Sequence, residues 1–172
     1  MNHDPIQQLM QPTPIRVLGL SPQQRADLLE QSAWSLSFTR SDLMVLAEFM
    51  KACSGGPGSV LCKEGDTESS MGILIEGSAT VLKTPASGGA PKAVGRLGKD
   101  KSFGEMSVLN REPRSATVIA DTEVKLLILP RAEFDRLLDT QPKMAAKFLL
   151  RLARLLSQRL RETTGQLAEQ LG

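Results

Sequence analysis

The central part of the chain, residues 57–130, alternates between short apolar runs and glycine-rich turns. The apolar runs are at most about six residues long, and turn signals separate them at roughly ten-residue intervals. This spacing is typical of a chain that forms many short antiparallel strands. The pattern predicts about eight short strands folded into an antiparallel β-roll or jelly-roll. The strands whose bounds the pattern gives are Val60–Cys62, Met71–Ile75, Ala79–Leu82, Val94–Leu97, Ala116–Ala120 and Val124–Leu129.

Two helices are expected before the roll, within residues 21–56. Ser21-Pro22 has the form of an N-cap followed by proline in the first helical turn, and a second start is expected at Ser41-Asp42. The cluster Gly55-Gly56-Pro57-Gly58 ends this region. Residues 1–20 carry three prolines and no periodic pattern, so we expect a loose leader.

The last region, residues 131–172, returns to helical periodicity. A short helix around Phe134 is followed by a longer one from Pro142, in which leucines recur at spacings of three and four residues. This stripe is suited either to packing within the molecule or to a parallel homodimer through residues 145–171. The whole chain is therefore predicted to be one α+β domain, with N-terminal helices, a β-roll and a long C-terminal helix.

Composition excludes several kinds of chemistry. The chain has 172 residues, a net charge of +2, two cysteines and one histidine. Because Cys53 and Cys62 form no CxxC pattern and His3 lies near the terminus, the sequence offers no zinc ligand set and no Cys–His or Ser–His catalytic pair. It also shows no signal peptide and no run of about 18 apolar residues, so we expect a cytoplasmic protein without membrane insertion.

One segment carries candidate chemistry: Ser102-Phe103-Gly104-Glu105-Met106-Ser107-Val108-Leu109, followed four residues later by Arg114-Ser115-Ala116-Thr117-Val118. Gly104 permits close backbone approach, and the free N–H groups of a helical turn beginning at Glu105 suit an anion. Arg114 can return to the same anion as a bidentate donor. A carboxylate beside an anion is useful when the ligand also carries a hydroxyl, as a ribose cyclic phosphate does. The alternative is that Glu105 and Arg114 form an ordinary surface ion pair.

This stretch resembles the phosphate-binding cassette of the cyclic-nucleotide-binding domain family, which includes catabolite-activator-type regulators, regulatory subunits of cyclic-AMP-dependent kinase and nucleotide-gated channels. Pro57-Gly58-Ser59-Val60-Leu61, Glu64-Gly65-Asp66 and Ile73-Leu74-Ile75-Glu76-Gly77 resemble the family's first roll strands and turns, so the likeness extends over about residues 35–162. It implies that amides near Gly104 and Ser115-Ala116 hold a phosphate opposed by Arg114, while Glu105 accepts from the ribose 2′-OH. The implied ligand-binding residues of the cassette, 102–118, are Phe103, Gly104, Glu105, Met106, Ser107, Arg114, Ser115 and Ala116. In the family the helix after the roll covers the base, for which Arg151, Arg154 and Arg159 are the candidates.

The resemblance also implies a function. In the family a threonine directly after the cassette arginine favours cyclic GMP. Ser115 stands there, and its hydroxyl could act in the same way or simply contact the phosphate; we expect cyclic AMP in preference to cyclic GMP, with no other cofactor. No helix-turn-helix follows the long helix in the given sequence, so we expect either a stand-alone, bacterial-type sensor without direct DNA binding or an excised fragment of a longer protein. Such a sensor would not be an enzyme and would switch an unidentified protein partner by moving its C-terminal helix. Two alternatives stay open: a member of the same fold that binds cyclic di-GMP, and a ligand-free structural or dimerisation module.

Overall fold

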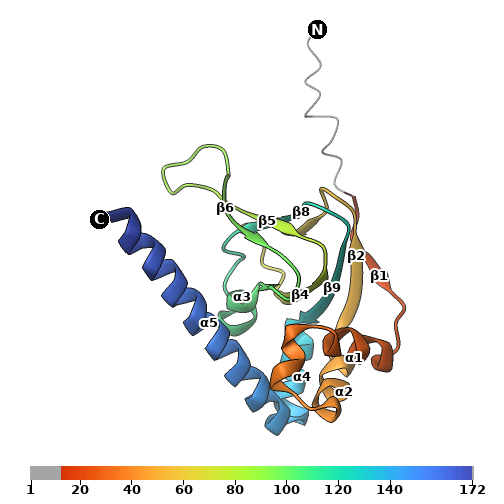
Figure 1. Ribbon diagram of the computed structural model, residues 1–172. Helices are drawn as coiled ribbons and strands as arrows, with labels where there is room; N and C mark the ends of the chain where they lie inside the picture. The colour runs from red at the N-terminus through yellow and green to blue at the C-terminus, as the bar shows by residue number, and fades with distance from the viewer. Residues whose placement is uncertain (1–12, 172) are drawn as a thin grey trace.

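The computed structural model describes residues 13–171, so most of the expected leader lies outside the described residues (Figure 1). The helices are α1 (Pro22–Glu30), the 3-10 helix η2 (Ala33–Ser37), α2 (Arg40–Glu48), α3 (Glu105–Asn110), α4 (Arg131–Thr140) and α5 (Pro142–Leu171). The strands are β1 (Arg16–Leu18), β2 (Lys51–Gly55), β3 (Val60–Cys62), β4 (Ser70–Glu76), β5 (Ala79–Lys83), β6 (Lys92–Leu97), β7 (Ser102–Phe103), β8 (Thr117–Ala120) and β9 (Val124–Pro130).

The strands form two antiparallel sheets that together make the roll. One sheet has five strands in the order β1-β2-β9-β4-β7, and the other has four in the order β3-β8-β5-β6. Helices α1, α2 and α4 gather at one end of the roll, while α5 runs along its side past α3 (Figure 1). The predicted α+β class, with an antiparallel roll between N-terminal helices and a long C-terminal helix, is confirmed.

The alternation of side chains along the strands divides the core in two. On β4, Met71, Ile73 and Ile75 belong to the cluster shared with the helices, whereas Leu74 belongs to the cluster inside the roll. Successive residues of a strand point to opposite faces of a sheet, which explains why β4 is buried on both sides. The five-stranded sheet is therefore the middle layer between the helices and the interior of the roll.

Three strands lie where the sequence pattern did not predict them. Residues 51–55, expected in the helical region 21–56, form β2, and residues 16–18, within the expected leader, form β1. Both are strands because of their partners: β2 pairs with β9 from Lys51 to Gly55, and β1 pairs with β2. The two-residue strand β7 pairs with β4 in the same way. Such short segments carry no periodicity of their own, so only pairing identifies them.

Helix boundaries follow local capping. Ser21 caps α1 as expected, with its side chain accepting from the Gln24 amide. The second helix begins two residues earlier than predicted, because Thr39 and Asp42 form a capping box in which each side chain accepts from the backbone N–H of the other. Such reciprocal bonds satisfy N–H groups that would otherwise lack partners at a helix start.

Helix α5 has two unlike halves. Its first half is packed into the core by Met144, Ala145, Phe148 and Leu152, and the ring of Phe148 lies 5.9 Å from that of Trp34. Beyond Arg159 the described side chains are exposed. In the described part of the chain, no helix combines the length and apolar character needed to cross a membrane.

Candidate functional site

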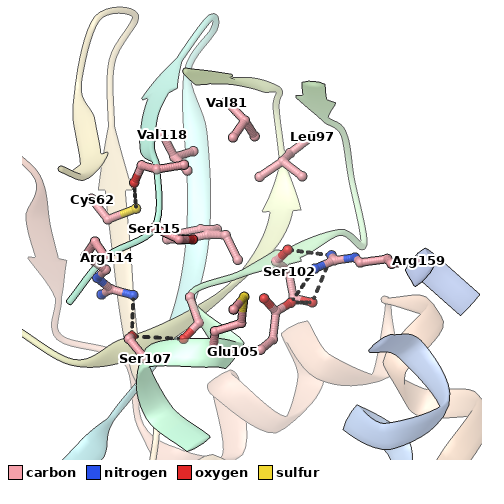
Figure 2. A pocket seen from close by; sticks show the side chains of 14 residues that line it. Cys62, Val81, Leu97, Ser102, Glu105, Ser107, Arg114, Ser115, Val118 and Arg159 are labelled. Carbon is pink, nitrogen blue, oxygen red and sulfur yellow. Dashed lines mark hydrogen bonds and ion pairs between the residues drawn. The ribbon is translucent and has the colours of Figure 1, made fainter. Parts of the chain in front are cut away.

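A cavity of about 190 Å³ opens between the four-stranded sheet and helix α3 (Figure 2). Every expected cassette residue lines it, from Phe103 to Ser107 and from Arg114 to Ala116. The expected residues that it brings together are up to 13 positions apart in the sequence. Its remaining lining residues are Cys62, Val81, Leu97, Ser102, Val118 and Arg159.

Phe103 fixes the position of the start of the cassette. Gly72 of β4 pairs with Phe103, and a Cβ built on Gly72 would lie only 2.3 Å from the Phe103 ring. The ring therefore occupies the space that any side chain at position 72 would need. This contact accompanies the pairing of β7 with β4 at the edge of the five-stranded sheet, and α3 begins directly after β7.

Gly104 is required for two reasons. Its φ of 79° is left-handed, a conformation that L-residues rarely adopt. A Cβ there would also lie 2.2 Å from Nη1 of Arg114 and 2.4 Å from the Ser70 carbonyl oxygen. Glycine therefore allows the Arg114 guanidinium to pack directly against the backbone at the start of α3, where the first N–H groups have no acceptor within the helix.

Arg114 is held in place from the opposite side of the cassette. Its side chain is buried, with the residue 6% exposed. Nη1 donates to the carbonyl oxygen of Ser70 and to Oγ of Ser107 at 3.0 Å, and Nη2 donates to Oγ of Ser70 at 2.8 Å. All these acceptors are neutral, so within the described contacts the positive charge has no carboxylate partner and stays available to an anion in the cavity.

Glu105 is buried as well, at 4% exposure, but its partners are of a different kind. Its Oε1 accepts from the hydroxyl of Ser102 and, at 2.9 Å, from Nη1 of Arg159 on α5. Because both of these contacts fall on Oε1, we expect Oε2 to be the acceptor for a ligand hydroxyl. No ion pair joins Glu105 to Arg114 among the described residues, so the alternative of a surface pair between them is wrong.

The three arginines expected to cover a base lie in different surroundings. Arg159 lines the cavity, where it binds Glu105 and donates from Nη2 to the Ser102 carbonyl oxygen at 2.6 Å. Arg151 instead lies over the Trp34 ring, 5.1 Å from its centroid, and lines a neighbouring cavity. Arg154 is exposed. Of the three, Arg159 is placed to meet a ligand, and it contacts the cassette itself.

The apolar wall of the cavity was not singled out from the sequence. It is formed by Cys62, Val81, Leu97 and Val118, one from each strand of the four-stranded sheet. Alternation along each predicted strand marks which residues share a face, but it does not say which face encloses a ligand. Burial raises the pKa of the Cys62 thiol, which keeps that side chain neutral and suited to an apolar surface. Ser70, the main partner of Arg114, had no sequence signal at all.

Across residues 13–171, no group of three or more His, Cys, Asp and Glu side chains is arranged as metal ligands. The charged groups at the cavity are Glu105, Arg114 and Arg159. They can hold an anion at one end of the cavity and a hydroxyl at the other.

Residues 55–141 match the model of the cyclic nucleotide-binding domain, and the chain belongs to that family. The family match covers strands β3 to β9, the cassette and α4.

Relatives and solved structures agree with this assignment. The chain is 36% identical over 106 residues to a cyclic nucleotide-gated potassium channel of Mesorhizobium japonicum, a match that covers 62% of this chain and 28% of the channel. It is 32% identical over 112 residues to a cAMP-dependent protein kinase regulatory subunit of Pyricularia oryzae, covering 65% of this chain and 28% of that protein. The chain thus spans less than a third of the length of these curated relatives. A crystal structure of a cyclic nucleotide-binding domain from Methylobacillus flagellatus superposes with a TM-score of 0.77 at 25% identity, covering 88% of this chain and 86% of that one.

Proposed function

We propose that this chain is a sensor that binds a 3′,5′-cyclic nucleotide in the cavity over α3. The observation that carries the proposal is the separation of two buried charged groups, Arg114 and Glu105, which line one cavity without pairing with each other. A buried charge is costly unless it is compensated. Glu105 is compensated by Arg159, whereas Arg114 has only neutral partners among the described contacts and would be compensated by an anion in the cavity. A ribose cyclic phosphate offers one anionic phosphate for Arg114 and one free hydroxyl for Glu105.

We further propose cyclic AMP as the preferred nucleotide. The wall beyond the phosphate end is apolar, formed by Val81, Leu97 and Val118 together with Cys62, and Ser115 also lines the cavity. Both bases carry one exocyclic amino group, but guanine has in addition a ring N–H and a carbonyl oxygen that would need partners, and an unpaired buried polar group costs about 1–3 kcal/mol. Adenine leaves fewer such groups without a partner.

The proposed output is a change in α5. Arg159 connects α5 to the cassette through Glu105, the same carboxylate that would accept from the ribose, and through the Ser102 carbonyl. A ligand at Glu105 therefore acts on the atoms that hold the far half of α5 against the roll. A population shift of this kind requires that ligand affinity differ between the attached and released helix.

The partner of α5 is also part of the proposal. Leu160 and Leu167 are exposed and lie one heptad apart on α5, which suits a parallel pairing of two copies or a helix of another protein. We propose that a partner protein binds the released helix and that the sensor acts in the cytoplasm. We also propose that the cavity binds and does not catalyse, with no cofactor, because Glu105 is engaged by Ser102 and Arg159 and is not poised as a base.

The decisive experiment is native mass spectrometry of the purified chain, followed by calorimetric titration with cyclic AMP, cyclic GMP and cyclic di-GMP. We expect one cyclic AMP per chain and weaker binding of cyclic GMP. We also expect the hydrogen exchange of the amides of residues 155–169 to change when the chain is saturated with ligand. Binding of cyclic di-GMP alone would replace the proposed ligand. Absence of binding by all three would leave a structural or dimerisation module, and the subunit count from the same spectra would report whether it pairs.

A further inference from the structure

The two halves of the cassette are supported differently. The first half ends in α3, whose own hydrogen bonds order it. The second half, residues 114–116, precedes β8, which begins only at Thr117, and has no regular secondary structure. Its peptide groups can present either N–H or C=O to the cavity. An N–H group attracts an anion, whereas a carbonyl oxygen repels it. Something outside the cavity must therefore set their orientation.

The turn at residues 64–66 performs part of this task. The Gly65 N–H donates to the Arg114 carbonyl oxygen at 2.9 Å, and the Arg114 N–H donates to the Asp66 carbonyl oxygen at 2.8 Å. The Glu64 N–H donates to Oγ1 of Thr117 at 2.9 Å. These bonds anchor both sides of the irregular segment but do not reach the carbonyl of Ser115.

Lys83, the last residue of β5, reaches that carbonyl. Its Nζ donates to the Ser115 oxygen at 2.5 Å and is paired with Oε1 of Glu64. The other oxygen of Glu64 accepts from the Thr84 N–H at 2.9 Å. Lys83 and this backbone N–H lower the pKa of Glu64 to about 2, so the pair is charged at neutral pH.

The geometry of the peptide bond links Lys83 to the cavity. The described chain has no cis peptide bonds, and in a trans peptide the C=O and N–H point in opposite directions. Neither Lys83 nor Glu64 lines the cavity, whereas Ser115 and Ala116 both do. A Ser115 carbonyl bound to Lys83 therefore turns away from the cavity and leaves the Ala116 N–H on the other side. If this peptide flipped, its oxygen would face the anion and repel it.

We propose that Lys83, oriented by Glu64, is a positioning residue for the anion site: it binds the Ser115 carbonyl and so keeps the following N–H available to the ligand. This inference rests on the proposed function, in that the anion is taken to be the phosphate of a cyclic nucleotide. Lys83 acts through the peptide and does not touch the ligand.

The test replaces Lys83 by methionine, which keeps an unbranched side chain and removes the charged donor. Lys125→Met is the matched control, because Lys125 pairs with Glu76 at 2.7 Å on the other sheet and lines no part of the cavity. We expect Lys83→Met to weaken cyclic AMP binding about tenfold, as for loss of one charge-assisted hydrogen bond, while Lys125→Met leaves the affinity unchanged. Lys83→Arg, which can still donate to the carbonyl, should restore most of the affinity. Equal affinity of Lys83→Met and the wild-type chain would overturn the proposal.

A double variant separates two ways in which Lys83 could act. If it merely neutralises Glu64, then Lys83→Met combined with Glu64→Gln should recover wild-type affinity. If it holds the peptide, the double variant should stay as weak as Lys83→Met. Recovery in the double variant would therefore overturn the positioning role.

A ligand-free measurement keeps this inference distinct from the proposed function. Hydrogen exchange of the Gly65 and Arg114 amides, whose N–H groups bond across the same segment, should be several-fold faster in Lys83→Met than in the Lys125→Met control, whether or not a nucleotide binds. Unchanged exchange would contradict the positioning role even in a chain that binds no cyclic nucleotide. Failure to bind in the wild-type chain would count against the proposed function alone.

Discussion

The two ends of the cavity are built on different supports. At the Arg114 end, the guanidinium is bound by Ser70 and Ser107, which belong to the roll and to α3. At the Glu105 end, the carboxylate is bound by Ser102 beside it and by Arg159, which comes from α5, 54 residues away in sequence. One charged group is thus fixed within the roll, and the other is shared with a helix whose distal half is exposed.

This difference assigns separate tasks to the two ends. A rigid, preformed anion site loses little ordering free energy when ligand binds, so it can supply affinity. A group shared with α5 can instead convert binding into movement, because ligand and helix compete for, or jointly use, the same carboxylate. The comparison predicts that changes at the first end abolish binding, and that changes at the second end alter the helix more than the affinity.

The largest effect is expected for Arg114→Ala. It removes the charge that would oppose the phosphate, and we expect affinity for cyclic AMP to fall at least about 100-fold, corresponding to about 3 kcal/mol. Calorimetry measures the loss, and circular dichroism checks that the secondary structure is retained. Arg114→Lys should remain strongly impaired, because an ammonium cannot reproduce the guanidinium's fork of donors. Retained affinity in both variants would remove Arg114 from the site.

A smaller loss is expected for Gly104→Ala. The new Cβ would crowd Arg114 and the Ser70 carbonyl in a left-handed backbone, so we expect affinity to fall by roughly 10-fold to 100-fold and stability by about 1–3 kcal/mol. Gly88→Ala is the control, because Gly88 has a φ of 82° but nothing within 4 Å of its Cβ position. If both variants behaved alike in ligand titration and thermal unfolding, backbone strain alone would explain the loss and the packing of Arg114 on Gly104 would have no role.

The smallest change in affinity is expected for Arg159→Gln. It leaves the anion site intact, so we expect the affinity for cyclic AMP to stay within about tenfold of wild type, while hydrogen exchange over residues 155–169 becomes faster. Arg161→Gln is matched to it, since Arg161 contacts only Ser157 of its own helix among the described bonds. Identical exchange in the two variants would show that the Arg159–Glu105 contact does not hold α5, and the two ends of the cavity would then not differ as proposed.

Much of this arrangement could be predicted from local sequence signals. Ser21 and Pro22 mark the start of α1, the apolar runs mark six of the nine strands in residues 13–171, and the cassette motif identifies eight residues that line the cavity. These predictions succeed because capping, alternation and glycine turns act over a few residues. The prediction failed for β1, β2 and β7, which are short and are identified only by their pairing. The sequence also did not single out Arg159 as the arginine that contacts the cassette, since nothing in its surroundings on α5 distinguishes it from Arg154.

By itself, the sequence of this chain determined the α+β order of elements and the cassette in which Gly104, Glu105 and Arg114 occur, since these depend on backbone freedom, charge and spacing along one short segment. Only the tertiary structure decided which groups those residues meet: Ser70 for Arg114, Arg159 for Glu105 and Lys83 for the Ser115 carbonyl. These partners lie 32 to 54 positions away, where sheet pairing and helix packing, and not local propensity, bring side chains together.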